Sequence, residues 1–259
     1  MIHMIGQAIS SCEQVPRRWL QRLWGYSDIH TRQKWMVLRS ALCRLPEKGV
    51  HLLDAGCGRG SWALELAATR PNWSIVGLDR ELKSLDVAEA SRRRMGLSNV
   101  SFVQADFLEF QSEAKFDVVL SVASAHYLAE AGKGEQLFNC FHSWLKPGGQ
   151  LLLIGPRHEG ETLFVSLLPQ PERRRGVFAA HELKDLCRVN GLAVETLCGR
   201  IGKLGTLAKQ LDWVIGSHFL SFVVGLYPLQ WCLTLIDSRR HFDDAEPTLL
   251  WLLVARAVV

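Results

Sequence analysis

Paired cysteines are missing from this 259-residue sequence. Seven cysteines are present, but no two of them have the spacing of a Cys-x-x-Cys pair. An odd count without paired spacing disfavours both a disulfide framework and a structural zinc site. The reducing cytosol is the simplest compartment for such a chain. We therefore predict a cytoplasmic protein without a metal.

The chain also lacks a large excess of positive or negative charge. The net charge is +4, and charged residues make up 22% of the chain, so wholesale disorder is not expected. Basic residues form only short clusters, at 92–94, 173–175 and 239–240. A nucleic-acid-binding domain usually carries a denser basic stripe. We therefore expect no nucleic-acid partner, and we interpret these clusters as solvated helix ends and loops.

The segment before residue 47 lacks the pattern of a secretory signal. Residues 1–11 are apolar, but they are too few and no basic segment precedes them. Helical periodicity follows over residues 17–24 and 31–45. We predict that residues 1–46 form an N-terminal helical cap.

Residues 50–60 read Val-His-Leu-Leu-Asp-Ala-Gly-Cys-Gly-Arg-Gly and are the most informative segment present. An apolar run ends in an acid, glycines follow at 56, 58 and 60, and a helix-forming segment begins at 61. This pattern predicts a buried strand, a tight turn and a helix start, with backbone that a ligand can approach closely. The spacing fits neither the dinucleotide fingerprint nor a P-loop. An ordinary strand-to-helix turn stays the alternative to a site for an adenosine-containing cofactor.

Apolar runs and helical segments alternate along the rest of the chain. The predicted strands are 73–78, 100–103, 116–122, 150–154, 192–197 and 249–258, and the predicted helices are 61–69, 82–95, 135–144 and 181–190. Alternation of this kind predicts a parallel sheet covered on both faces. Right-handed crossovers place every carboxyl end at one edge. The glycine turn, Asp79, Asp106 and residues 121–126 should therefore converge there.

These segments together resemble the class I S-adenosylmethionine-dependent methyltransferases. The resemblance runs in order over roughly residues 50–155. It is carried by Asp54-Ala-Gly-Cys-Gly-Arg-Gly60, Gly77-Leu-Asp79, Gln104-Ala-Asp106-Phe107, Phe116-Asp117-Val-Val-Leu120 and Leu145-Lys-Pro-Gly-Gly149. It implies an α/β fold with a doubly wound, mostly parallel, seven-stranded Rossmann-like sheet whose last strand is antiparallel. Residues 47–200 and 247–259 would form the cofactor-binding domain, and residues 201–246 a helical insertion between strands six and seven.

The resemblance also assigns the cofactor, S-adenosylmethionine, to particular residues. Asp79 would hold the two ribose hydroxyls, Asp106 would meet the adenine amino group, and the glycine turn would pass under the methionine part. A carboxylate suits a diol because charge-assisted hydrogen bonds are strong. The complete predicted set is Asp54, Gly56, Cys57, Gly58, Asp79, Arg80, Asp106, Phe107 and Ser121.

Methyl transfer depends mainly on positioning, and a base is needed only where the nucleophile carries a proton. His126 follows the fourth strand and titrates near neutrality, so it is the first candidate for that base. A histidine that only packs or orients the substrate is the alternative. His158 is a second candidate, and Tyr127 could shape the pocket.

The acceptor is suggested by one absence and one apolar segment. Relatives that methylate exocyclic amines of bases or some protein amides carry Asn/Asp-Pro-Pro-aromatic after the fourth strand, where this chain has Ser121-Val-Ala-Ser124. Residues 213–236 lack a formal charge, and could form a cover over the active site, a membrane-surface segment or a true membrane span. Further lid or substrate candidates are Tyr26, His30, Arg32 and His218.

We therefore expect methyl transfer to O, N or C of a small, fairly apolar metabolite. A membrane-associated lipid or quinone methyltransferase and a non-catalytic cofactor-binding scaffold remain alternatives. The oligomeric state stays open.

Overall fold

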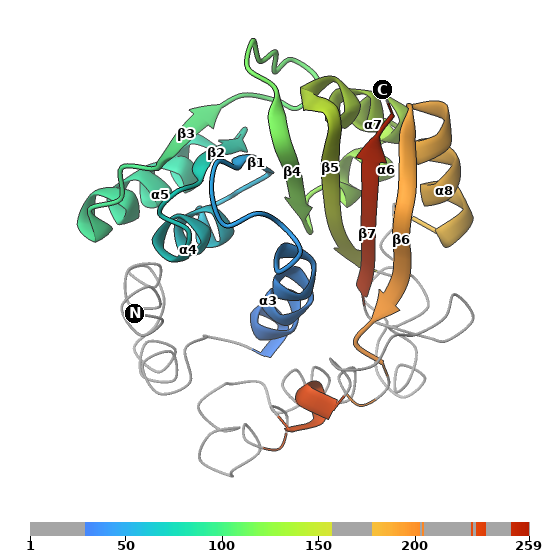
Figure 1. Cartoon of the computed structure of the whole chain (residues 1–259), viewed down its shortest axis with the longest axis horizontal. Coiled ribbons are helices and arrows are strands. Elements are labelled where there is room, and N and C mark those ends of the chain that lie inside the picture. Colours follow the sequence, from blue (N-terminus) through green and yellow to red (C-terminus); the bar gives the residue numbers. More distant parts are fainter. Residues whose placement is uncertain are drawn as a thin grey trace. The chain divides into compact units, whose positions relative to one another are not determined.

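The computed structural model of the chain describes residues 29–156, 178–202, 204, 229, 232–236 and 250–258 (Figure 1). The predicted helix 17–24 and most of the segment 213–236 lie outside these residues. The same holds for the candidates Tyr26, His158 and His218, and the side chains of His30 and Arg32 are not described. Their roles stay predictions.

The described residues form a seven-stranded sheet in the order β3-β2-β1-β4-β5-β7-β6. The strands are β1 His51–Ala55, β2 Ser74–Asp79, β3 Val100–Gln104, β4 Phe116–Val122, β5 Leu145–Pro156, β6 Leu192–Arg200 and β7 Leu250–Ala257. Neighbours from β3 to β5 pair in parallel, and β7 points opposite to β5 and β6 (Figure 1). This confirms the predicted doubly wound, mostly parallel fold.

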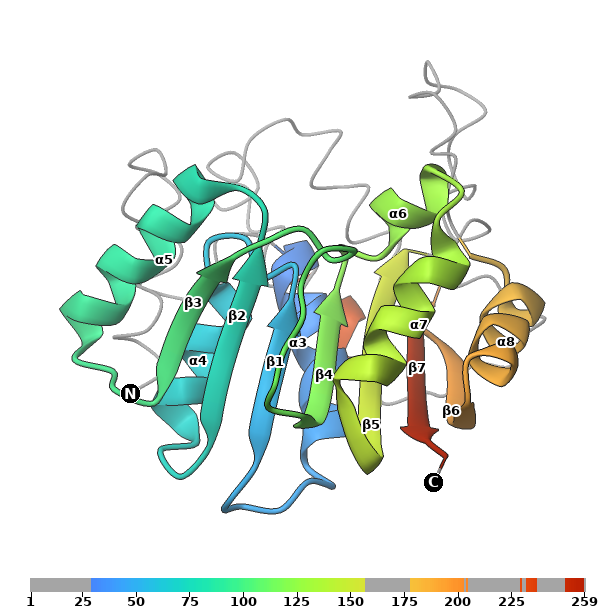
Figure 2. The same cartoon turned by 90° about the horizontal axis from the view of Figure 1, so that it is seen from above.

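The helices are α3 Ile29–Leu42, α4 Ser61–Thr69, α5 Leu82–Met95, α6 His126–Glu130, α7 Gly134–Trp144 and α8 Ala180–Val189. Helices α4 and α5 pack against β2 and β3, whereas α7 packs against β4 and α8. Figure 2 shows α4 behind the sheet and α7 in front of it. The central strands are therefore covered on both faces, which explains why β1 and β4 are almost continuously buried.

The bounds of α4 and α5 are those that the sequence predicts, because local residues end both helices. Gly60 precedes α4 and Gly96 follows α5, both in the left-handed region that glycine adopts readily. The basic cluster at 92–94 occupies the last turn of α5, where positive charge opposes the helix dipole.

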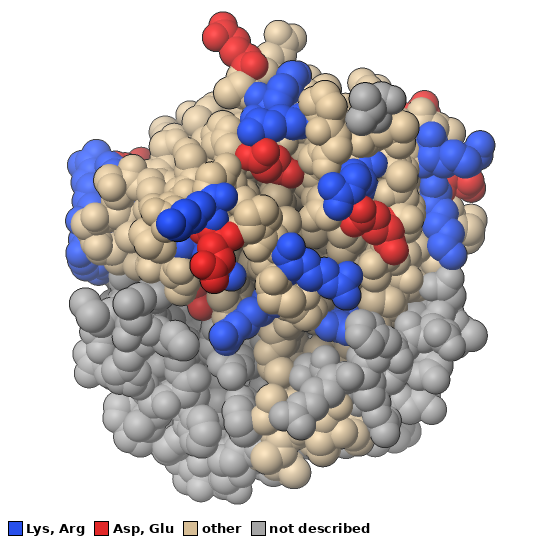
Figure 3. All heavy atoms as spheres, in the orientation of Figure 1, with Lys and Arg blue, Asp and Glu red and all other residues tan. Residues whose placement is uncertain are grey.

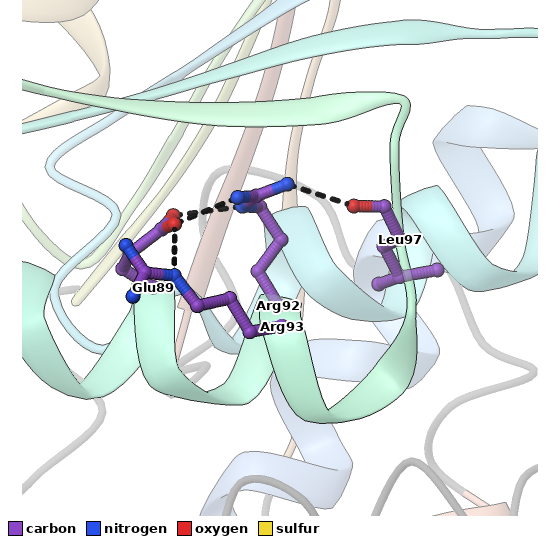
Figure 4. Close-up of polar contacts among 4 residues, drawn as sticks. All are labelled: Glu89, Arg92, Arg93 and Leu97. Carbon is purple, nitrogen blue, oxygen red and sulfur yellow. Dashed lines mark hydrogen bonds and ion pairs between the residues drawn. The ribbon is translucent and has the colours of Figure 1, made fainter.

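Side-chain bonds also hold the C-terminal end of α5 (Figure 4). The Glu89 carboxylate accepts two hydrogen bonds of 2.7 Å from Arg92 and one of 3.0 Å from Arg93. These bonds, Arg92 foremost, lower the pKa of Glu89 to about 2. Arg92 also donates to the backbone oxygen of Leu97 at 3.0 Å. This part of the basic cluster is engaged in ending a helix, as we predicted.

The segment 145–149 differs from the prediction, which had β5 beginning at residue 150. The strand begins at Leu145, and an irregularity separates the pair Phe116–Leu145 from the pair Val118–Gln150. Gly148 has a φ of +74°, so the Pro-Gly-Gly segment forms a bulge within the strand rather than a turn before it.

The chain divides into two compact units. The first comprises residues 1–43, 156–175 and 198–252, and the second comprises 44–155, 176–197 and 253–259. Every motif that carries the family resemblance lies in the second unit. Among the described residues, no helix is both long and apolar enough to cross a membrane.

Candidate cofactor site at the carboxyl ends of the strands

The glycine turn between β1 and α4 is fastened to the neighbouring strand. The backbone N–H groups of Gly56 and Cys57 both donate to the Leu78 oxygen, at 2.8 and 3.0 Å. The Gly60 N–H donates to the Cys57 oxygen at 2.9 Å. Positive φ angles of 79°, 53° and 73° at Gly56, Gly58 and Gly60 make this sharp path possible.

The three glycines face different surroundings. A Cβ on Gly56 would lie 2.3 Å from the Ser124 Cβ, and one on Gly60 would lie 2.8 Å from the Phe102 ring. A Cβ on Gly58 would have no neighbouring atom within 4 Å. Protein atoms therefore occupy the space that a side chain at Gly56 or Gly60 would need, while the roles of Gly56 and Gly58 toward the cofactor stay predictions. Gly58 alone of the three presents open backbone.

Asp79 ends β2 and holds the turn from the other side. Its Oδ2 accepts the Gly58 N–H at 2.7 Å, and its Oδ1 accepts the Glu81 N–H at 3.0 Å. A carboxylate has about four acceptor sites, so about two remain after these bonds. Asp79 can therefore bind a pair of hydroxyl groups without leaving the turn.

Asp54, in β1 directly before the turn, is fully buried. Burial, opposed by the Ala63 backbone N–H and assisted by the charge of Asp79, raises the pKa of its carboxyl to about 7. In the described part of the chain, neither carboxyl oxygen makes a hydrogen bond of normal geometry. Near neutral pH the Asp54 carboxyl therefore exists in both its neutral and its charged form.

Cys57 lies inside the turn and is buried. Burial raises the pKa of its thiol above the ordinary value, and the negative charges of Asp54 and Asp79 act in the same direction. A thiol in these surroundings stays protonated and is a poor nucleophile. The residue fills space in the turn.

The end of β3 lies beside Asp79, because Asp79 pairs with Gln104 in the sheet. The Asp106 Oδ1 accepts the Leu108 N–H at 3.0 Å, which fixes the loop after β3. Phe107 packs against Phe141 and Trp144 with ring centroids 6.5 and 6.1 Å apart. Its ring edge also lies over Gly56, 3.2 Å from the position of a Cβ there.

The end of β4 is held against the glycine turn by two serines. The Ser124 hydroxyl donates to the Ala55 oxygen at 2.8 Å, and the Ser121 and Ser124 hydroxyl oxygens are 2.8 Å apart. Ala123, between them, has a φ of +55°, which a non-glycine residue seldom adopts. Strain of this kind often occurs at functional sites.

Ser124 lies within the range 121–126 that we expect at this edge, but it is not in the predicted set of cofactor residues. Its place over Gly56 follows from the left-handed turn at Ala123, which the sequence does not announce. A second serine three residues after Ser121, just beyond the strand, was the available indication.

His126 begins the short helix α6, and its side chain is buried with 7% exposed. Its ring lies 4.1 Å from that of Tyr127, which is 62% exposed. Arg80 is also exposed, and its backbone oxygen accepts a bond from Gln104 at 3.3 Å. The structure thus brings the glycine turn and the ends of β2, β3 and β4 together, while the individual roles stay predictions. Among the described residues, no group of three or more metal-ligating side chains occurs.

Comparison with known proteins identifies the family to which the chain belongs. Residues 46–215 match the family model described as methyltransferase domain. The release factor glutamine methyltransferase of Escherichia coli (strain K12) is 31% identical over 85 residues, covering 33% of this chain and 31% of that protein. The ribosomal RNA small subunit methyltransferase G of Psychromonas ingrahamii is 34% identical over 140 residues, 53% of this chain and 54% of that protein. The chain therefore spans less than two thirds of either relative.

A solved structure shows the same fold. The phosphoethanolamine N-methyltransferase 2 of Haemonchus contortus, in complex with S-adenosyl-L-methionine, superposes with a TM-score of 0.61 at 16% identity. The superposition covers 96% of this chain and 61% of that one.

Proposed function

Because this chain belongs to the S-adenosylmethionine-dependent methyltransferases of the methyltransferase-domain family, we propose that it methylates O, N or C of a small, fairly apolar acceptor. The observation that carries the proposal is the meeting of Gly58, Asp79, Asp106 and Ser121 at the carboxyl ends of four adjacent strands. Ligands of open α/β sheets bind at this edge.

The residues present fit S-adenosylmethionine. Gly58 offers backbone that no side chain covers, and Asp79 keeps acceptor sites for the two ribose hydroxyls. Phe107 places an aromatic ring beside the turn, and Asp106 follows the strand next to Asp79. The bound cofactor would supply a methyl group on a positively charged sulfur.

The chain's own residues would then position the reactants. In-line alignment of nucleophile and methyl group can supply roughly 7–11 kcal/mol of the barrier. His126 would remove a proton where the acceptor carries one. Its ring lies 4.1 Å from that of Tyr127 at an interplanar angle of 34°. The exposed face of Tyr127 would contact an apolar acceptor.

The acceptor class rests on what surrounds the site. The two curated relatives are named for a protein and an RNA substrate, but the segment Ser121-Val-Ala-Ser124 lacks the Asn/Asp-Pro-Pro-aromatic sequence typical of amide and exocyclic-amine methylation. On the face drawn in Figure 3, basic and acidic side chains are interspersed over the described residues. Over the described residues of this face there is no basic stripe of the kind that nucleic-acid-binding domains carry, which supports a small acceptor. A lipid or quinone acceptor at a membrane surface remains the alternative, through residues 213–236.

The first experiment measures the cofactor alone. Calorimetry should show that the full chain binds S-adenosylmethionine and S-adenosylhomocysteine, and that Asp79→Ala weakens both by at least about tenfold, because a charged acceptor is lost. Asp86→Ala, at an exposed position of α5, is the matched control and should leave both affinities unchanged. Unaltered affinity in the Asp79 variant would contradict the proposed site.

The second experiment measures the acceptor. Transfer of a labelled methyl group should be tested to a panel of apolar aromatic compounds, to a quinone in vesicles, and to release-factor protein and ribosomal RNA. The proposal expects label only in the soluble small molecules. Label in protein or RNA would show that the acceptor is a macromolecule and contradict the proposed acceptor class. Cofactor binding without transfer to any acceptor would favour the non-catalytic cofactor-binding scaffold.

A further inference from the structure

Strand β3 is the outermost strand at one end of the sheet, and among the described residues its only neighbouring strand is β2 (Figure 1). The Ile75 N–H donates to the Asn99 oxygen at 3.0 Å, and the Ala105 N–H donates to the Asp79 oxygen at 3.1 Å. Because backbone groups of successive strand residues point to opposite sides, the odd-numbered residues of β3 direct theirs to β2. The backbone groups of the even-numbered residues point away from β2; these residues are Val100, Phe102 and Gln104.

The edge of β3 lacks the protection that edge strands usually carry. Native proteins commonly place charged residues or proline at such an edge, because its unpaired backbone groups can pair with another strand. Residues 95–105 contain neither a formal charge nor a proline. The edge strand at the other end of the sheet, β6, contains Glu195 and Arg200. We therefore expect β3 to be the edge that pairs with another strand.

One face of β3 is also uncovered. The Phe102 ring lies against Gly60 and Gly77, so the side chains of Ser101 and Val103 point to the opposite face. Both residues are exposed. The segment that joins β3 to β4 is described throughout and forms no helix, whereas helices join β1 to β2 and β2 to β3. A further strand beside β3 would cover part of the apolar side chain of Val103.

The outward-pointing residues of β3 suit an antiparallel copy of the same strand. A two-fold axis at Phe102 pairs this residue with Phe102 of the second copy, and it pairs Val100 with Gln104 of the second copy. Each of these pairs exchanges two backbone hydrogen bonds, so the two strands would share about six. The same surface then serves both partners, and the assembly closes at two copies.

The charges beyond the two ends of β3 complement each other in this arrangement. Before β3, residues 92–94 end α5 with three arginines against the single acid Glu89, and the last two arginines are exposed. In an antiparallel pair, this basic end lies next to the carboxyl end of β3 in the other copy, and opposite charges favour that orientation. The carboxyl end has more acids than bases around it, namely Asp79, Glu81, Asp106 and Glu109 against Arg80 and Lys83.

We propose that two copies of this chain associate through β3, in an antiparallel pair about a two-fold axis at Phe102 that joins their sheets into one. This pairing depends neither on the cofactor nor on the acceptor. The strand has five residues, so the interface is small. We therefore expect a weak dimer that forms at micromolar rather than nanomolar concentrations of the chain.

Sedimentation equilibrium of the full chain tests this pairing. From about 1 to about 100 μM, the average mass should rise from that of the 29.2 kDa monomer toward twice that value. Val103→Lys should weaken the association at least about tenfold, because the two lysines would lie about 7–8 Å apart on one face of the joined sheet. Val194→Lys is the matched control on the other edge strand, since Val194 is 37% exposed and Val103 is 36% exposed. This control should leave the association unchanged.

A charge exchange keeps the test decisive if Val103→Lys does not fold. Arg94→Glu and Glu109→Arg should each weaken the association about threefold, because each places like charges at the paired strand ends. The double variant should associate within about twofold of the wild type, because the charges are then opposite again. A wild-type chain that stays monomeric throughout would overturn the proposal. Equal weakening by Val103→Lys and Val194→Lys, or a double variant no better than the single ones, would also overturn it.

Discussion

Replacing Asp54 by Asn should stabilise the folded chain at high pH and have a much smaller effect at low pH. The pKa of this buried carboxyl rises from 3.8 to about 7, chiefly because burial disfavours its charge. At about 1.36 kcal/mol per unit, a shift of about three units corresponds to about 4 kcal/mol at most. Between about pH 4 and pH 7 the folded state holds a proton that the unfolded state releases, so stability falls as pH rises.

The assay is urea unfolding of the wild-type chain and of Asp54→Asn at several pH values. The free-energy difference between the two should widen by about 3 kcal/mol from pH 5 to pH 8, in favour of Asn. Asp86→Asn, on the exposed side of α5, is the control and should show no such pH-dependent gain. A constant difference across the pH range would refute the reasoning, because Asp54 would then have the same pKa in both states.

Substitutions at three positions, Gly56, Gly58 and Ala123, test the geometry of the turn. Gly56→Ala should destabilise the chain by more than about 2 kcal/mol, because its Cβ would overlap that of Ser124 at a positive φ; urea unfolding measures this. Gly58→Ala should cost only about 1 kcal/mol of stability but weaken S-adenosylhomocysteine at least about tenfold in calorimetry, since only its open face is filled. Ala123→Gly should change stability by less than about 1 kcal/mol, because relief of the left-handed strain offsets the entropy of glycine, whereas Ala123→Val should destabilise clearly. Equal effects of Gly56→Ala and Gly58→Ala on folding, or a stable Ala123→Val, would contradict the described turn.

The parts of the fold that the sequence predicts are those decided by neighbouring residues. Helices α4 and α5 have the predicted bounds because Gly60 and Gly96 act within a turn of the helix ends. The parallel sheet follows from continuous apolar runs separated by helices, a pattern that burial on both faces requires. The strand residues 145–149 lie outside the predicted strand 150–154, because pairing with β4, which no local pattern shows, keeps that segment in the sheet.

The sequence predicts where the candidate site lies in the fold, but it predicts few of the contacts between the site residues. Asp79 ends β2 and Asp106 follows the neighbouring strand β3, and their proximity follows from topology alone. The role of each glycine does not follow from topology. What a Cβ would meet at Gly56 or Gly60 depends on Ser124, which follows β4, and on Phe102, which lies in β3. No local pattern announces that Ala123 adopts a positive φ and carries Ser124 back over the turn.

The turn and β4 therefore constrain each other, and this has a consequence for how the site binds. Gly56 must lack a side chain because Ser124 occupies that space, and Ser124 is held there by the backbone of Ala55, the residue before Gly56. The same turn is fastened on its other side by Asp79 through Gly58. A ligand that contacts Asp79 and Ser124 together would bridge β2 and β4 across a turn that is already fixed from both sides. Binding of such a ligand would carry little entropic cost for ordering the protein. Its affinity should therefore depend on its own contacts and on its length across the strands.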